Sequence, residues 1–75
     1  MLEERLRKVF REIFSQPRLE ISDDMSAEDI SDWDSLKHIQ LIVAVEKEFG
    51  FKFKNSEIAR LKNIGDLKAL VGKYA

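Results

Sequence analysis

Helix-breaking residues are scarce in this chain, and its apolar residues recur at helical spacing. Only one proline and three glycines occur in 75 residues, and residues that favour helices are abundant among the rest. Between positions 2 and 14 the apolar residues recur at intervals of three and four, which predicts one stripe of an amphipathic helix. Because Pro17 disfavours helical backbone angles at Gln16, we predict that this helix stops near Ser15 or Gln16.

A second helix is predicted from about Ser35 to Phe49. Asp34 and Ser35 are both of the residue types preferred at helix N-caps, and an apolar-rich run follows them directly. Gly50 stands at the position where a glycine commonly ends a helix in the left-handed conformation. The start and the stop of this helix are therefore both marked in the sequence.

The last third of the chain predicts two more helices. A short one should be capped by Asn55 or Ser56, and a fourth should follow Asn63, with Asp66 as a partner in an arrangement like a capping box. Phe and Lys alternate over residues 51–54. Since no second strand is available to pair with so short a segment, we interpret it as an extended connection whose aromatic residues fill the core.

A long acidic loop separates the first two predicted helices. Residues 17–34 lack sustained periodicity, and residues 19–36 contain seven acidic and no basic residues, whereas residues 1–18 carry +2 and residues 37–75 carry +4. Isolated apolar residues within the loop indicate that it is pinned to the core, and residues 26–30 have the composition of a single helical turn. The predicted fold is all-α: a small four-helix bundle with a long first loop and a short third helix.

Composition excludes several classes of function. The length supports one domain with one core. The absence of cysteine excludes disulfides and thiolate ligands, and with His38 as the only histidine we predict no metal site and no histidine-based catalytic triad. A net charge of −1 argues against nucleic-acid binding. The longest apolar run, residues 41–45, is too short to span a membrane, and the N-terminus lacks a signal-peptide pattern, so we expect a cytoplasmic protein.

The predicted second helix is apolar on more than one side. Leu41 and Val45 lie on the stripe that should face the core, whereas Leu36, Ile39 and Val43 form a second stripe that is rotated by roughly 100° or more. A helix of a small bundle needs only one buried face, so the second stripe requires a separate function.

The loop ends in the sequence Asp32-Trp33-Asp34-Ser35-Leu36. A serine at a helix start is usually a cap, but a helix start also favours anions such as phosphate, because its free N–H groups and the helix dipole point at them. The sequence places no His–Asp pair beside Ser35, so we interpret this serine as the acceptor of a group rather than as a hydrolytic nucleophile.

In this setting the chain resembles an acyl carrier protein. The resemblance rests on the triplet Asp34-Ser35-Leu36, on the long acidic loop before it, on the helix that ends Glu-Lys-Glu-Phe-Gly at residues 46–50, and on the last helix, which begins Asn-Ile-Gly-Asp-Leu at residues 63–67. It covers essentially the whole chain, and the size suits a single, free-standing carrier domain over residues 1–75.

The resemblance implies a function and a cofactor. In the family, the serine that matches Ser35 receives 4′-phosphopantetheine from coenzyme A through a phosphopantetheinyl transferase and Mg²⁺, with Asp34 and Leu36 as the flanking motif. The arm ends in a thiol that carries acyl groups as thioesters to an acyl ligase or synthase, and the acyl chain can lie between the helices. The protein would be a carrier and not an enzyme, and we expect a monomer.

The resemblance also implies a partner surface that departs from that of fatty-acid carriers. In those carriers the second helix is typically acidic and docks on basic patches, whereas here Lys37, Gln40 and Lys47 occupy positions that are often acidic. Charge complementarity governs partner choice, so we expect a specialised carrier with its own enzymes. The full set of residues that match the partner surface, including the unusual Trp33, is Trp33, Leu36, Lys37, Ile39, Gln40, Val43, Glu46 and Lys47.

Two residues and two further classes of function remain open at this stage. Trp33 resembles carriers of polyketide-like or other secondary pathways, and it serves either as a docking residue or as a loop anchor packed on the second helix. His38 is interpreted as a partly solvated helix residue, and a role near the arm is the alternative. A helical protein-interaction module without a prosthetic group is the main alternative to a carrier; a helical DNA binder is disfavoured, because residues 37–48 balance two basic with two acidic residues.

Overall fold

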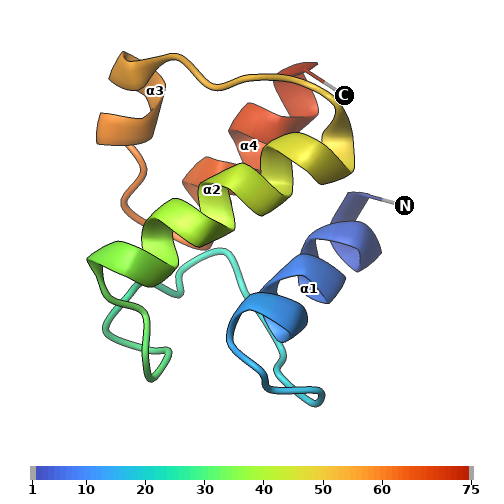
Figure 1. The fold of residues 1–75 in the computed structure, drawn as a ribbon, viewed down its shortest axis with the longest axis vertical. Helices are drawn as coiled ribbons and strands as arrows, with labels where there is room; N and C mark the ends of the chain where they lie inside the picture. The colour runs from blue at the N-terminus through green and yellow to red at the C-terminus, as the bar shows by residue number, and fades with distance from the viewer. Residues whose placement is uncertain (1, 75) are drawn as a thin grey trace.

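The computed structural model describes residues 2–74, and within them it contains four helices and no strand (Figure 1). These are α1 (Leu2–Ile13), α2 (Ser35–Phe49), α3 (Asn55–Ala59) and α4 (Ile64–Tyr74). The predicted all-α bundle with a long first loop and a short third helix is confirmed. None of these helices is long and apolar enough to cross a membrane.

α1 ends slightly earlier than the proline predicts. Its last helical residue is Ile13, and Ser15 adopts the left-handed conformation with φ 53°. The Gln16 N–H then donates to the Arg11 carbonyl at 3.0 Å, the six-to-one hydrogen bond of a Schellman motif. The helix is therefore closed by its own C-terminal hydrogen bonding before the restriction imposed by Pro17 takes effect.

α2 begins and ends as the sequence predicts. The Asp34 carboxylate accepts a hydrogen bond from the Lys37 N–H at 2.8 Å, so Asp34 is the N-cap. At the other end Gly50 has φ 76° and donates to the Glu46 carbonyl at 2.8 Å. A residue with a side chain would be strained in this conformation.

The predicted cap of α3 is wrong by one residue. Asn55 is already helical, and the N-cap is Lys54 rather than Asn55 or Ser56. The reason is Glu57, whose carboxylate accepts the Lys54 backbone N–H at 2.9 Å. A lysine side chain has no acceptor atom, so the glutamate reaching back stabilises this helix start in place of a capping side chain.

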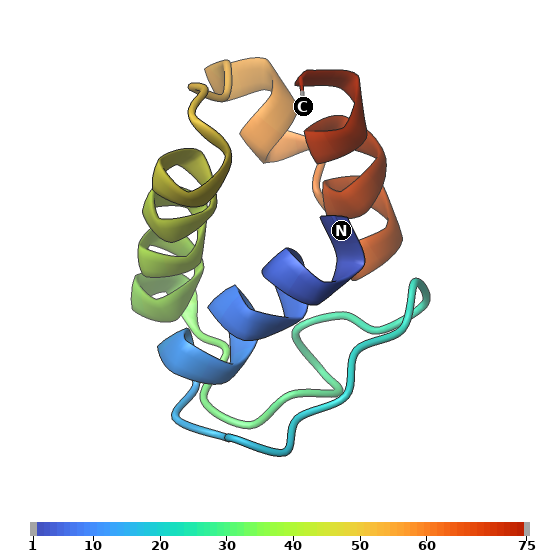
Figure 2. The same ribbon diagram turned by 90° about the vertical axis from the view of Figure 1, so that its right-hand side faces the viewer.

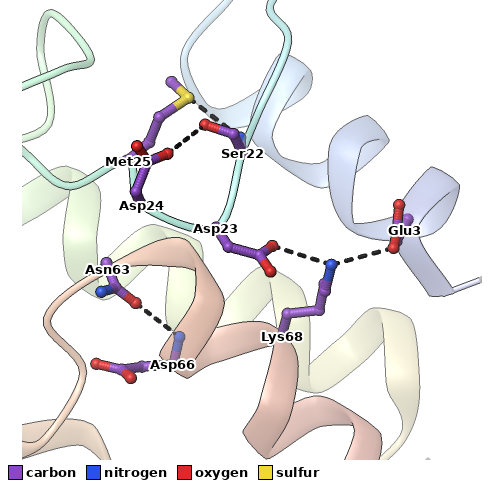
Figure 3. Close-up of polar contacts among 8 residues, drawn as sticks. All are labelled: Glu3, Ser22, Asp23, Asp24, Met25, Asn63, Asp66 and Lys68. Atoms are coloured by element: carbon purple, nitrogen blue, oxygen red, sulfur yellow. Dashed lines mark hydrogen bonds and ion pairs between the residues drawn. The ribbon is translucent and has the colours of Figure 1, made fainter.

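α4 begins after Asn63, as predicted, but its carboxylate partner acts differently. Asn63 Oδ1 accepts the Asp66 N–H at 2.8 Å, which is the expected N-cap hydrogen bond (Figure 3). The Asp66 carboxylate does not return to Asn63 and instead accepts the Lys62 N–H at 3.1 Å. The Asp66 carboxylate thus holds the backbone of the α3–α4 connection at Lys62, just before α4 begins.

The long loop is docked onto the start of α4. Figure 2 shows it running from the end of α1 to the lower end of α4 and back to the start of α2. The Ile64 N–H donates to the Met25 carbonyl at 2.8 Å, and the Gly65 N–H donates to the Asp23 carbonyl at 2.8 Å. These bonds satisfy two N–H groups of the first turn of α4 that have no partner inside the helix.

Lys68 joins three separate parts of the chain. Its Nζ lies 2.9 Å from Asp23 Oδ1 in the loop and 3.0 Å from Glu3 Oε1 at the start of α1 (Figure 3). The hydrogen bond to Asp23, followed by that to Glu3, raises the pKa of Lys68 above its usual value. The ammonium group therefore holds the loop between α1 and α4.

The hydrophobic core lies between α1, α2 and α4, and three of its residues lie outside the helices: Phe14 directly after α1, Ile30 in the loop and Phe53 in the α2–α3 connection. Phe53 of that connection is buried. The ring of Phe51 packs edge-on against that of Phe53, with 4.8 Å between ring centroids, and stacks on the ring of Tyr74, with 4.7 Å between centroids. The predicted role of residues 51–53 in filling the core is thus confirmed. The buried residues are Leu6, Val9, Phe10, Phe14, Ile30, Leu41, Ile42, Val45, Phe53, Ile64, Leu67 and Val71.

Candidate functional site

Ser35 is the first residue of α2, and its side chain is exposed. Both Asp34 and Ser35 could have been the helix cap from their residue types. The structure assigns the cap to Asp34, whose carboxylate already satisfies the Lys37 N–H. The Ser35 hydroxyl is therefore not required for capping, and it lies in solvent at the positive end of the helix dipole.

Tight backbone turns in the last residues of the loop place the serine. Ile30 is buried and accepts the Trp33 N–H through its carbonyl at 3.3 Å. Asp32 has φ 69°, a left-handed conformation that aspartate tolerates better than most residues, and its carbonyl accepts the Asp34 N–H at 2.9 Å. A buried anchor followed by two turns thus delivers Asp34 to the cap position and Ser35 to the surface.

Trp33 is a structural anchor of this loop end. The centroid of its indole ring lies 5.6 Å from the ring centroid of Phe10 and 5.6 Å from that of Phe14, and both phenylalanines are buried core residues. Its Nε1 donates to His38 Nδ1 at 3.1 Å, and the two rings stack at 6.1 Å. Trp33 therefore contacts α2 as the anchor interpretation requires, and it also joins α2 to α1.

The single histidine of the chain is occupied by this contact. His38 Nδ1 accepts the indole N–H, so a neutral His38 carries its proton on Nε2. Among residues 2–74 no group of three or more His, Asp or Glu residues is arranged to hold a metal ion. The arrangement suits a serine that receives a group from a separate enzyme better than one that attacks a substrate.

The second apolar stripe of α2 faces solvent. Leu36, Ile39 and Val43 are 63%, 62% and 44% exposed, whereas Leu41 and Val45 of the first stripe are fully buried. The helical period thus separates the two stripes as the sequence indicates. The exposed stripe begins next to Ser35 and runs along the outer side of α2, so it is available to a partner protein.

The polar residues of the predicted partner surface divide into two groups. Gln40 and Lys47 are exposed. Lys37 and Glu46 are partly buried and make internal contacts: Lys37 Nζ donates to the Ile13 carbonyl at the end of α1 at 3.1 Å, and a Glu46 carboxylate oxygen accepts the Phe53 N–H at 2.8 Å. These two side chains hold the fold around α2, a role that their charge alone did not predict.

A small cavity of about 170 Å³ lies beside this site. Trp33 and His38 form the part of its wall that is nearest to Ser35 along the chain, and the rest is largely apolar, with Leu41, Ile42, Leu61 and Leu67 contributing. The cavity therefore lies between the loop, α2 and the α3–α4 region. The sequence predicted no role for His38 in such a wall.

A sequence signal for the Trp33–His38 contact existed. With Asp34 as the N-cap, Trp33 is the residue before the cap and His38 is the fourth helical residue. An apolar contact between these two positions is the hydrophobic staple, which fixes the angle at which the chain enters a helix. Once the cap is assigned, the pairing of Trp33 with His38 follows from their spacing.

The site thus combines an exposed serine that follows a capping aspartate with a helix that carries a solvent-facing apolar stripe. The family model described as "Phosphopantetheine attachment site" matches residues 4–71. An acyl carrier protein of Acidothermus cellulolyticus is 31% identical over 61 residues, which are 81% of this chain and 73% of the relative. The chain thus belongs to the phosphopantetheine attachment family and is an acyl carrier protein.

Solved structures agree with this assignment. The solution structure of the holo acyl carrier protein from Geobacter metallireducens has a TM-score of 0.90 at 40% identity, and the match covers 96% of this chain and 83% of that one. A putative acyl carrier protein from Mycobacterium tuberculosis has a TM-score of 0.89 at 25% identity and is covered completely, as is this chain.

Family membership decides between the functions that the sequence left open. Acyl carrier proteins bear 4′-phosphopantetheine and serve enzymes without being enzymes themselves, so the predicted cofactor and the prediction of a non-enzymatic protein are confirmed. The carrier is thereby favoured over an interaction module without a prosthetic group.

Proposed function

We propose that Ser35 is the residue that carries 4′-phosphopantetheine, and that residues 1–75 form one carrier domain that acts as a monomer. A phosphopantetheinyl transferase loads the arm, and an acyl ligase or synthase uses the loaded carrier. The observation that carries the proposal is the exposed hydroxyl of Ser35 at the start of α2, freed from capping by Asp34.

The residues around Ser35 fit the group. The serine hydroxyl oxygen would bear it, with Asp34 and Leu36 on either side, and the first turn of α2 favours a phosphodiester through its dipole. When bound, the group supplies a thiol, which the chain lacks because it contains no cysteine. Exposure of Ser35 and Leu36 leaves the position open to a transferase.

Intact-mass measurement tests the attachment site. The protein is incubated with coenzyme A, Mg²⁺ and a promiscuous phosphopantetheinyl transferase. We expect a mass gain of one phosphopantetheine in the wild type and in Ser31→Ala, a control at an exposed serine of the preceding loop, and none in Ser35→Ala. A gain that persists in Ser35→Ala, or an unmodified wild type beside a modified control carrier, contradicts the proposal.

The pathway that we propose is a specialised branch of fatty-acid, polyketide-like or related acyl transfer. The support comes from the charge of the outer face of α2. Gln40 and Lys47 are exposed there, while the acids Glu46 and Glu48 are held by the Phe53 N–H and by Arg5. A partner that docks through a basic patch therefore meets little acidic charge on the outer face of this helix, because Glu48 is paired with Arg5 and Glu46 is directed to the Phe53 N–H.

Enzymes of standard fatty-acid synthesis provide the test. Loaded wild type should be elongated at least tenfold more slowly than a housekeeping carrier at low salt. The double variant Gln40→Glu, Lys47→Glu should recover part of the rate, whereas Lys8→Glu, an exposed charge change on α1, should not. If the wild type is elongated as fast as the housekeeping carrier, the proposal that it has its own set of partner enzymes is wrong.

A further inference from the structure

The route from Ser35 to the small cavity passes the Trp33–His38 pair. Ser35, His38 and Ile42 are spaced at i, i+3 and i+7 on α2 and so lie along one side of the helix. His38 and Ile42 both line the cavity, together with Trp33 from the loop. A group attached at Ser35 therefore meets His38 before it reaches the apolar wall beyond.

Contacts with the core and with each other hold the rings of Trp33 and His38 in place. The indole of Trp33 lines the cavity and packs on the rings of Phe10 and Phe14, which are 0% and 3% exposed. Its N–H is bonded to His38 Nδ1 at 3.1 Å, so neither ring turns without losing the bond. Because the indole separates the cavity from the α1 side of the core, the cavity cannot extend in that direction while Trp33 stays in place.

The cavity that Trp33 and His38 help to line is small. An apolar cavity of about 150 Å³ holds one benzene-sized ligand, that is, about six carbon atoms. The cavity here is about 170 Å³. Its wall is mainly apolar, with Leu41, Ile42 and Leu67 among the lining residues, so the cargo that it suits is a short, apolar acyl chain.

We propose that Trp33 and His38 are specificity-determining residues that, as a hydrogen-bonded pair, close the cavity toward α1 and limit the acyl groups it can shelter to about six carbons. The inference rests on the proposed attachment at Ser35. Both residues are positioning residues of the cargo wall and take no part in acyl transfer itself.

The experiment compares acyl chains of increasing length on the complete protein. A promiscuous transferase loads Ser35 from acyl-coenzyme A, from acetyl to dodecanoyl, and intact mass confirms loading before any further measurement. Failure of loading at Ser35 refutes the proposed function and is seen at this step. The rate at which hydroxylamine cleaves the thioester then reports how well each loaded acyl group is sheltered.

In the wild type, cleavage should slow with each added methylene up to hexanoyl, by at most about fourfold per buried methylene, and then level off. In Trp33→Ala the slowing should continue to octanoyl or decanoyl. Trp33→Phe, which keeps an aromatic ring on Phe10 and Phe14 but loses the hydrogen bond to His38, should relax the limit by less than Trp33→Ala does. Lys52→Ala, at an exposed position of the α2–α3 connection, should retain the wild-type limit. The same limit in Trp33→Ala and wild type, or wild-type protection that grows steadily to dodecanoyl, overturns the proposal.

A second measurement needs no variant. Trp33 is the only tryptophan in the chain, so its fluorescence reports directly on the wall of the cavity. Emission should change between acetyl and hexanoyl cargo and stay constant from hexanoyl to dodecanoyl. Emission that does not respond to the cargo refutes the assignment even where Trp33→Ala fails to fold.

Discussion

The amide of Gly65 donates a hydrogen bond to the carbonyl of Asp23 at 2.8 Å, and a Cβ on Gly65 would lie only 2.9 Å from that same oxygen. It would also lie 3.1 Å from the Cβ of Asp23. The close approach of the acidic loop to the start of α4 therefore requires a residue without a side chain at position 65. The glycine is set by this contact and not by an unusual backbone angle.

Gly65→Ala should lower the free energy of unfolding by about 1–3 kcal/mol, because either the loop or α4 must shift. Gly72→Ala is the matched control in the same helix: its nearest neighbour is Leu2 Cδ1 at 4.0 Å, so the change should stabilise by up to about 1 kcal/mol through helix propensity. Urea unfolding measures both. Equal effects of the two substitutions would contradict the contact.

Replacing the cap of α2 should destabilise the protein without removing Ser35, the proposed attachment serine. Asp34→Ala deletes the acceptor for the Lys37 N–H and should cost about 0.5–2 kcal/mol, whereas Asp34→Asn keeps an acceptor and should cost much less. Thermal unfolding compares the two. If Asp34→Asn is as unstable as Asp34→Ala, the carboxylate acts through its charge at the helix start and not as a cap.

Truncation should destabilise the protein strongly in the buried apolar stripe of α2 and hardly at all in the exposed one. Leu41→Ala removes a fully buried side chain and should cost about 2–5 kcal/mol. Ile39→Ala, at a position that is 62% exposed, should change the free energy of unfolding by less than about 0.5 kcal/mol. Denaturant titration separates these outcomes, and a large loss at Ile39 would mean that the outer stripe is buried in solution.

The Tyr74–Glu57 contact should make stability depend on pH at both extremes. The Tyr74 hydroxyl lies 2.9 and 2.8 Å from the two carboxylate oxygens of Glu57. The hydrogen bond to Glu57 raises the pKa of Tyr74. The backbone N–H of Lys54, followed by the Tyr74 hydroxyl, lowers the pKa of Glu57.

The stability contributed by Tyr74 and by Glu57 is lost in opposite directions of pH. A raised pKa of Tyr74 means that its stabilisation is complete below the ordinary tyrosine value of about 10 and is lost as pH rises through the folded-state pKa. A lowered pKa of Glu57 means that its stabilisation is present above the ordinary glutamate range and is lost as pH falls through the folded-state pKa.

Tyr74 is the only tyrosine, so ultraviolet difference spectroscopy follows its ionisation directly. Glu57→Gln should bring the pKa of Tyr74 down toward the ordinary value, and Glu28→Gln in the exposed loop should leave it unchanged. A tyrosine that titrates identically in Glu57→Gln and wild type would mean that the hydrogen bond does not form in solution.

Local chemistry made much of this fold predictable. The apolar period, the capping residue types at Asp34 and Asn63, and Gly50 at the end of α2 act within one or two helical turns, and each acts in the structure as predicted. The N-cap of α3 was mispredicted because Glu57 reaches back to the Lys54 backbone. That interaction replaces a capping side chain, so a search for capping residue types alone misses it.

The candidate site was predictable in position but not in surroundings. Ser35 could be located because the motif around it is continuous in sequence. The roles of Lys37 and Glu46 could not, because their partners, the Ile13 carbonyl and the Phe53 N–H, are brought near only when α1 and the α2–α3 connection pack against α2. Charge at a surface position thus did not reveal which charges are free.

The sequence by itself determined four helical segments, the acidic loop, the motif around the proposed attachment serine and the second apolar stripe of α2, because period, capping and composition are properties of neighbouring residues. Only the tertiary structure decided that the loop rests on Gly65, that Trp33 joins α1 to His38, and that a small, mainly apolar cavity lies beside that pair. These features depend on how segments distant in sequence fill a shared volume, and side-chain volumes in a close-packed interior are fixed only when all the segments are in place.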